Sequence, residues 1–235
     1  MQQYFVDYEL NVNETYDLRD DIIYHLTKVL RSTNKTFRLA DINGNIFLAN
    51  LKDNKALIID KLDENNELSC DITAIIALIK QDKFELTLQK LTELGVKRII
   101  PYNAVRSVVK ETKGEKKLIR YQKILTEASE QSHRNFVPEI LPAINLNEIK
   151  NYLSDLNLLA YENEDKLDNN FKAKSITFII GPEGGFDQKE VDELNKLGFK
   201  SISLGNRILR AETAAIYLTS VIVGDNQWRA LRLCL

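Results

Sequence analysis

The sequence predicts an α/β protein in which a small β-rich domain precedes a larger domain of alternating strands and helices. Residues 1–68 contain short segments rich in aromatic and β-branched side chains, as strands do. The polar stretch 63–69 (DENNELS) is the best candidate for a boundary. Strand-like and helix-like segments alternate after it, which is typical of a mainly parallel sheet covered by helices. We therefore expect one domain at 1–68 and a second at 69–235.

The first domain is expected to form a small β-barrel with one helix. Asn43-Gly44 lies between two apolar segments and is a strong signal for a hairpin turn. Asp17 is the candidate N-cap of the helix, because apolar residues recur after it at helical spacing. The helix is expected to end near Arg31. The expected strands are 4–8, 36–40, 46–51 and 56–62.

The second domain is expected to alternate five strands with helices. A helix through Phe84 and Leu91 should stop at Gly95, since glycine is the common residue just after a helix. Asp187 and Glu190 have the spacing of a capping box at the start of another helix. The expected strands are 72–79, 96–101, 156–161, 176–180 and 199–204, and the remaining helices are expected around 118–128, 147–153, 188–197 and 211–223.

Composition excludes several classes of protein. The apolar fraction of 44% and the charged fraction of 28% are those of an ordinary globular chain. No apolar run is long enough for a membrane span, and the N-terminus does not have the pattern of a secretory signal. Two distant cysteines and two histidines make neither a disulfide framework nor a metal centre. We therefore expect a cytoplasmic protein without a metal.

The charge of the chain is unevenly distributed. Residues 1–70 carry a net charge of −4, residues 80–137 carry +6 and residues 138–235 carry −3. A basic segment inside a mildly acidic protein indicates a local anionic partner. The alternative is a charged helix face that only meets water.

Three strand ends in the second domain are followed by unusual loops. These are 158–162 (LLAYE), 179–186 (IIGPEGGF) and 204–214 (LGNRILRAETA). Ligands bind at the carboxyl ends of strands in open α/β sheets, and glycines let a backbone approach a ligand closely. The alternative is that the glycines only shape turns. No dinucleotide-binding, P-loop or nucleophile-elbow motif is present, so a nicotinamide dehydrogenase or an NTPase is not supported.

Four stretches of the chain contain motifs that occur in a characteristic order and spacing. The first contains Lys83 and 89–96 (QKLTELGV) and continues to 100–101 and 106–108. The second joins 127–132 (EASEQS) to Arg134 and 137–140 (VPEI). The other two are 181–186 and 204–214. Together, in this order and spacing, the four stretches resemble the ribosomal RNA small subunit methyltransferase E family, and the combination is specific for it.

The resemblance implies an N-terminal PUA-like β-barrel and a C-terminal SPOUT α/β domain with a deep trefoil knot. It implies an S-adenosyl-L-methionine-dependent enzyme of rRNA processing that methylates N3 of a uridine in 16S rRNA of the small ribosomal subunit. It also implies a homodimer with the cofactor sites near the interface. Gln2 and Gln3 stand where the family has basic residues, and 32–35 replace a Gly-Asp, so RNA docking by the first domain is expected to differ in detail.

The resemblance assigns the cofactor to the three loops. The implied cofactor contacts are Leu159, Tyr161, Glu162, Ile180, Gly181, Pro182, Glu183, Gly185, Leu204, Gly205, Ile208, Leu209, Arg210 and Ala214. The expected RNA contacts are Arg31, Lys83, Lys90, Arg98, Arg106 and Arg134.

The chemistry adds candidate catalytic residues. Uridine N3 carries a proton, so a base is needed, or a cation that stabilises the developing anion. Arg210 is the candidate cation, and Glu183 and Glu212 are candidate carboxylates. The alternatives are that Glu212 caps the last helix and that Glu183 pairs with Arg210. Two other functions stay open: methylation of another RNA base or of a ribose 2′-hydroxyl, and a non-catalytic RNA-binding role in ribosome assembly.

Overall fold

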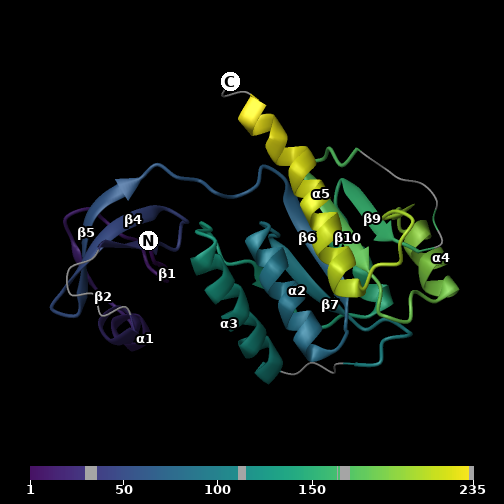
Figure 1. The fold of residues 1–235 in the computed structure, drawn as a ribbon, viewed down its shortest axis with the longest axis horizontal. Coiled ribbons are helices and arrows are strands. Elements are labelled where there is room, and N and C mark those ends of the chain that lie inside the picture. Colours follow the sequence, from purple (N-terminus) through teal and green to yellow (C-terminus); the bar gives the residue numbers. More distant parts are fainter. Residues whose placement is uncertain (30–35, 111–114, 163, 165–169, 233–235) are drawn as a thin grey trace. The chain divides into compact units, whose positions relative to one another are not determined.

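The computed structural model describes residues 1–29, 36–110, 115–162, 164 and 170–232, with only the backbone described for 115, 116 and 227–232 (Figure 1). The chain divides into two compact units. The first contains Met1–Glu67 and Ser129–Phe136, and the second contains Leu68–Ala128 and Val137–Leu235. The segment Ser129–Phe136 therefore belongs to the first unit, whereas the sequence placed it in the second domain.

The first unit is built on a five-stranded mixed sheet with the order β1-β3-β4-β5-β2. β1 pairs with β3 in parallel, and the other neighbours are antiparallel. Side chains of one sheet face and of the helical segment share a single apolar core. The elements are β1 (Gln3–Phe5), β2 (Thr15–Asp17), α1 (Asp20–Tyr24), the π-helical turn η1 (His25–Val29), β3 (Thr36–Ala40), β4 (Ile46–Lys52) and β5 (Lys55–Leu62).

The hairpin prediction for the first unit is confirmed, and the helix start is corrected. Gly44 lies in the turn between β3 and β4 with a φ of 75°, a conformation that glycine adopts without strain. Asp17 does not cap the helix. It lies in the short strand β2, which the sequence analysis missed, and the N-cap is Arg19. β1 and β2 form opposite edges of this sheet in the described residues, and the sheet curls into a half-barrel.

The second unit contains a six-stranded sheet with the order β11-β9-β10-β6-β7-β8, in which all neighbours are parallel. Its strands are β6 (Asp71–Ala77), β7 (Arg98–Tyr102), β8 (Glu139–Ile140), β9 (Leu156–Ala160), β10 (Ser175–Ile180) and β11 (Lys200–Ile202). Its helices are α2 (Gln81–Glu93), α3 (Glu115–Gln131), the 3-10 helix η2 (Leu146–Tyr152), α4 (Gln188–Lys196) and α5 (Ala211–Arg232). The expected parallel α/β sheet is confirmed.

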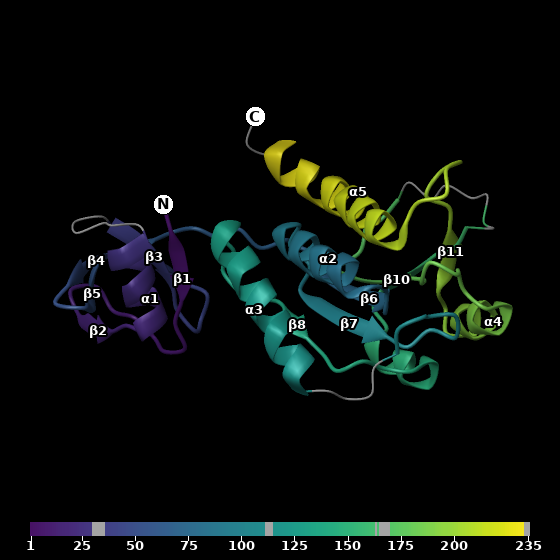
Figure 2. The same cartoon turned by 60° about the horizontal axis from the view of Figure 1, so that its bottom comes forward.

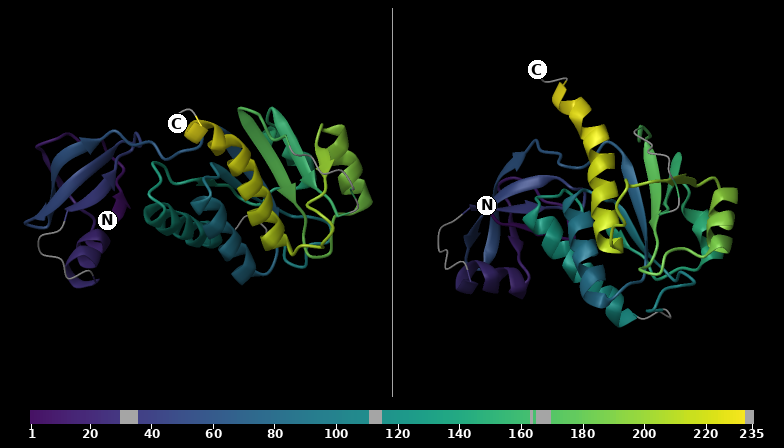
Figure 3. Two further views of the ribbon diagram at one scale, coloured as in Figure 1. Left: turned by 45° about the horizontal axis from the view of Figure 1, so that its top comes forward. Right: turned by 45° about the vertical axis from the view of Figure 1, so that its right-hand side comes forward.

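Helices cover both faces of this sheet. α2, α3 and α5 lie on one face, where Phe84, Leu125 and Leu218 pack into the same core as Ile76 and Phe178 (Figures 1 and 2). α4 lies on the other face, together with η2, as Figure 3 also shows for α4. In the strands between them, side chains alternate between the two cores. No helix in the described parts of the chain is long and apolar enough to span a membrane.

The elements of the second unit were predicted with different accuracy. Asp187 caps α4, accepting from Lys189 N at 3.1 Å, and the predicted capping box with Glu190 is present. β8 was missed because it is only two residues long. β11 is shorter than the expected 199–204, and α5 is longer than the expected 211–223.

Candidate functional site

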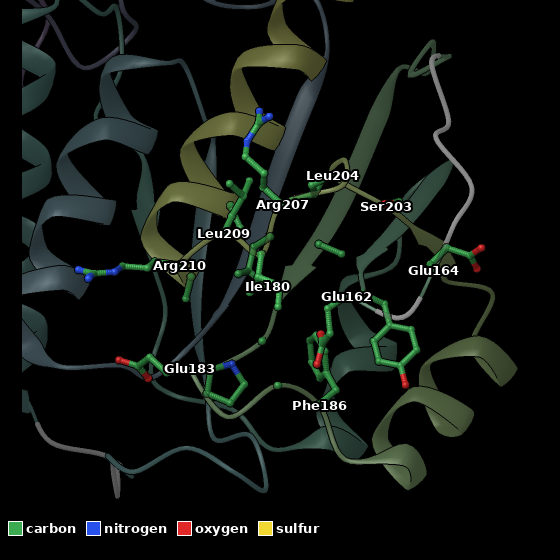
Figure 4. Close-up of a pocket in the computed structure, with 18 of the residues that line it drawn as sticks. Glu162, Glu164, Ile180, Glu183, Phe186, Ser203, Leu204, Arg207, Leu209 and Arg210 are labelled. Atoms are coloured by element: carbon green, nitrogen blue, oxygen red, sulfur yellow. The ribbon is translucent and has the colours of Figure 1, made fainter.

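Three adjacent strands of the second unit end beside one cavity. β11, β9 and β10 are neighbours in the sheet, and the loop after each of them lines a cavity of about 650 Å³. Figure 4 shows Glu162 and Glu164 from the first loop, Ile180, Glu183 and Phe186 from the second, and Leu204, Arg207, Leu209 and Arg210 from the third. The expected convergence of the three loops is therefore present in the structure.

The second loop is the most constrained part of the cavity wall. Gly185 N donates to Pro182 O at 2.9 Å and closes a tight turn. Gly185 has a φ of 70°, and the carboxylate of Glu162 occupies the place where a Cβ would stand. A Cβ on Gly181 would meet the ring of Phe186 at 2.8 Å. The φ of Gly185 favours glycine, and a side chain at either position would require Glu162 or Phe186 to move.

Polar groups of opposite charge surround the cavity. Glu162, Glu183, Arg207 and Arg210 are all exposed. Arg210 and Glu183 project to the same side in Figure 4, away from Ile180. No ion pair joins their side chains in the described structure, so the alternative that they only neutralise each other has no support. Both remain free to meet a ligand.

Most of the predicted cofactor contacts line the cavity, and one does not. The lining residues among them are Tyr161, Glu162, Ile180, Gly181, Pro182, Glu183, Gly185, Leu204, Gly205, Ile208, Leu209, Arg210 and Ala214. Leu159 is fully buried in the core on the α4 side of the sheet. Because side chains alternate along a strand, it cannot share a face with Leu158, which joins the opposite core.

Glu212 also lies outside the cavity lining. It is 8% exposed at the start of α5, and its Oε1 lies 3.8 Å from Lys83 Nζ. The structure therefore brings together a residue expected at the catalytic centre and a residue expected to contact RNA. Glu212 holds Lys83 near the first turn of α5.

Three further residues expected to contact RNA form ion pairs near the protein surface. Lys90 Nζ lies 2.8 Å from Glu93, and Arg98 Nε lies 2.6 Å from Glu139. Arg106 Nη2 lies 3.4 Å from Asp187, and its Nη1 donates to Gly184 O at 3.4 Å. All three basic side chains keep more than a third of their surface exposed, so a phosphate could replace these weak partners.

Arg134 differs from the other basic residues. Its side chain is only 5% exposed, and two of its nitrogens bind the Glu67 carboxylate, at 3.2 and 2.5 Å. A phosphate could reach it only by displacing this partner, which supports a structural role for Arg134 in the first unit, and its contact with RNA stays a prediction. Arg31 lies outside the described residues.

Several cavity residues were not predicted. They are Ala160, Glu164, Gly184, Phe186, Ser203, Asn206, Arg207 and Ala211. All of them lie in or next to the same three loops, so the signal that identified the loops also contained them. The ring of Phe186 belongs to the core on the α4 side of the sheet and also lines the cavity.

The cavity can hold a small molecule with mixed chemistry. Its volume is in the range of small-molecule sites. Ile180, Leu204 and Leu209 offer an apolar surface for a ring system, whereas Glu162 and Glu164 offer acceptors for hydroxyl or ammonium groups. Among the described residues, no group of three or more His, Cys, Asp or Glu is arranged to hold a metal.

The chain is similar to known proteins over most of its length. Residues 66–223 match a family model described as an RNA methyltransferase domain. The ribosomal RNA small subunit methyltransferase E of Mesomycoplasma hyopneumoniae (strain 232) is 34% identical over 96% of this chain and 100% of its own. The protein of the same name from Bacillus subtilis (strain 168) is 32% identical over 94% and 96%. The crystal structure of the Neisseria gonorrhoeae protein of that name, bound to S-adenosyl methionine, has a TM-score of 0.87 at 33% identity and covers 94% of this chain and 96% of that one.

Proposed function

Since the chain belongs to the ribosomal RNA small subunit methyltransferase E family, we propose that it transfers a methyl group from S-adenosylmethionine to N3 of a uridine in 16S rRNA. The observation that carries the proposal is the cavity formed by the loops after β9, β10 and β11. The similar Neisseria gonorrhoeae protein binds S-adenosyl methionine. The family membership and the cavity therefore point to the same activity.

The residues of the cavity fit this cofactor. Gly185 lines the cavity and has no side chain, so the backbone of the second loop can border the ligand directly. Ile180, Leu204 and Leu209 suit the adenine ring, and Glu162 suits the ribose hydroxyls or the amino group. S-adenosylmethionine, when bound, supplies a methyl group activated by the positively charged sulfur.

The chain must prepare the nucleophile. Uridine N3 gains its nucleophilic electron pair only as its proton leaves, and negative charge then develops on the uracil ring. We assign stabilisation of that charge to the exposed guanidinium of Arg210 and acceptance of the proton to Glu183, which projects to the same side. Glu212 pairs with Lys83 at 3.8 Å outside the cavity lining, so we assign it no direct part in this step.

The RNA partner is proposed to contact the basic segment 80–137. Arg98, Arg106, Lys90 and Lys83 are exposed enough to exchange their carboxylate partners for phosphates.

We further propose a PUA-like first unit, a trefoil knot in the second unit, a homodimer, and action in the cytoplasm on the small ribosomal subunit. The half-exposed ring of Tyr217 on α5 supports a contact between copies, although Leu218 and Ile222 of the same helix are buried within their own unit.

A reaction with purified components tests the proposal. The protein is incubated with S-adenosylmethionine and with small subunits whose rRNA lacks the modification, and the rRNA nucleosides are then analysed by mass spectrometry. We expect 3-methyluridine to appear only when enzyme and cofactor are both present. A 2′-O-methylated nucleoside would instead support methylation of a ribose 2′-hydroxyl. The absence of any new modified nucleoside would support a non-catalytic role.

A further inference from the structure

A buried carboxylate lies just outside the cavity. Glu190, in the first turn of α4, is 1% exposed. Its Oε1 accepts from the hydroxyl of Tyr102 and from Val105 N at 2.9 Å, and its Oε2 accepts from Asp187 N at 3.0 Å. A buried carboxylate is costly unless it is hydrogen-bonded, and this one has three donors.

The three donors come from two different places in the fold. Asp187 ends the second cavity loop, whereas Tyr102 and Val105 lie at and just after the carboxyl end of β7. An ordinary capping box needs only the contact between Glu190 and the backbone of Asp187. The contacts to Tyr102 and Val105 are additional. They connect the end of the loop after β10 to the end of β7, a strand that is not a neighbour of β10 in the sheet.

Burial and the nearby carboxylate of Glu190 both raise the pKa of Tyr102 far above its usual value. Its hydroxyl therefore keeps its proton and serves as a donor. A second connection between the same two segments lies near the surface, where Arg106 donates to Gly184 O and pairs with Asp187. The buried connection is the stronger one, since its donors are closer and water is excluded.

Asp187, whose backbone N–H is held by Glu190, lies next to the cavity wall. Phe186 and Gly185 directly precede Asp187, and both line the cavity. The other end of the loop begins at Ile180 in the buried strand β10. With one end fixed by the sheet and the other by Glu190, the position of Asp187 determines the shape of the loop between them.

We infer that Glu190 is a positioning residue for the cofactor, holding the loop 181–186 in its binding shape through Asp187, Tyr102 and Val105. The inference rests on the proposed function, because it assigns the cavity to S-adenosylmethionine. It extends the site to a buried group and to the end of β7, neither of which touches the cavity. Loss of the buried connection releases one end of the loop and weakens cofactor binding.

Glu190→Gln tests the inference with almost no change of shape. A carboxylate accepts with both oxygens, whereas an amide accepts with one side and donates with the other. Whichever way the amide is turned, either Val105 N or Asp187 N loses its acceptor. We expect the Kd of S-adenosylmethionine, measured by calorimetry on the full chain, to rise about tenfold, the order of effect of one unpaired buried donor.

Tyr102→Phe provides a second variant that retains the core volume. We expect it to raise the Kd about threefold, and to add little in the Glu190→Gln background because both changes act on one connection. Leu91→Ala is the matched control, since it destabilises the core on the opposite face of the sheet. It should lower the melting temperature and leave the Kd unchanged. In turnover assays, Glu190→Gln should raise the KM for the cofactor more than it lowers kcat.

The outcomes separate the inference from its premise. If the unaltered chain binds S-adenosylmethionine and both Glu190→Gln and Tyr102→Phe bind it equally well, Glu190 has only a structural role and the inference is wrong. If the Leu91→Ala control weakens binding as much as Glu190→Gln does, the effect is general destabilisation and the inference is also wrong. If the unaltered chain does not bind the cofactor, the proposed function is wrong, and the inference that rests on it is wrong as well.

Discussion

The carboxylate of Glu162 lies beside Gly185, with its Oε1 less than 3.0 Å from the position that a Cβ at Gly185 would take. This contact joins the loop after β9 to the loop after β10. Gly185 also has a φ of 70°, which favours glycine. Two independent constraints, one of space and one of backbone conformation, therefore apply at the same residue of the cavity wall.

Gly185→Val should weaken the binding of S-adenosylmethionine by well over tenfold, which corresponds to about 1.4 kcal/mol or more. The valine must displace Glu162 and also strains the backbone. Gly198→Val is the matched control, because Gly198 has a φ of 90° but no neighbouring atom that a Cβ would meet. Calorimetry should show weaker binding for the first variant alone. Unchanged affinity in folded Gly185→Val protein would show that S-adenosylmethionine does not bind beside Gly185.

Arg106→Ala should weaken RNA binding and flatten its dependence on salt. Each lost phosphate contact lowers the log–log slope by about 0.9 for duplex or 0.7 for single-stranded nucleic acid. Because Arg106 also contacts Gly184 O and Asp187, we expect a small loss of cofactor affinity as well. Titration of RNA at several salt concentrations measures the slope. A slope equal to that of the unaltered protein would mean that Arg106 contacts no phosphate.

Arg134→Ala should destabilise the protein and leave the salt slope of RNA binding unchanged. Removing the guanidinium leaves Glu67 with only the backbone N–H groups of Asn135 and Phe136, at 2.9 and 3.3 Å. Loss of one partner of a buried ion pair costs about 3 kcal/mol. Thermal unfolding measures the effect. A flatter slope with unchanged stability would instead restore the RNA contact that the sequence suggested.

Arg210→Ala should reduce turnover by about 10²-fold or more while RNA still binds, because a cation that stabilises developing charge acts mainly in the transition state. Single-turnover assays on assembled small subunits give the rate of the chemical step. Glu183→Gln should also slow that step if Glu183 accepts the proton from N3. Full turnover by Arg210→Ala would show that its assigned role is wrong and would leave Glu183 as the residue to test next.

Light scattering at micromolar concentration should give a mass of about twice the 27.0 kDa of one chain. Tyr217 is the most exposed large apolar residue of the described part of α5, so Tyr217→Glu should shift the mass toward that of one chain. Thr213→Glu, also exposed on this helix but without an apolar ring, is the control. A single-chain mass for the unaltered protein would contradict the homodimer.

Local signals predicted the parts of the fold that depend on neighbouring residues. The capping box of Asp187 and Glu190 and the turn at Gly44 are set within a few residues, and both are present. The cavity loops were identified because glycines and charges follow buried strands, a pattern with a clear steric and electrostatic meaning. The strand order that makes the three loops neighbours is not encoded locally and came from the structure.

Three expected site residues have surroundings in the structure that the sequence analysis did not include. Arg134 has the charge of an RNA contact, but Glu67, far away in the sequence, covers it. Leu159 belongs to the expected segment, but strand alternation turns it away from the cavity. Glu212 was expected at the catalytic centre, and it pairs with Lys83 on another helix. For Arg134 and Glu212 the partner cannot be found by spacing along the chain, whereas the alternation that turns Leu159 away is a local property of the strand.

The most direct test of the central claim is nucleoside mass spectrometry of small-subunit rRNA from cells that lack this protein. The account predicts that 3-methyluridine disappears from that rRNA and returns when the unaltered chain is supplied. Gly198→Val should restore it, whereas Gly185→Val should not. An unchanged level of 3-methyluridine in the cells without the protein would contradict the account.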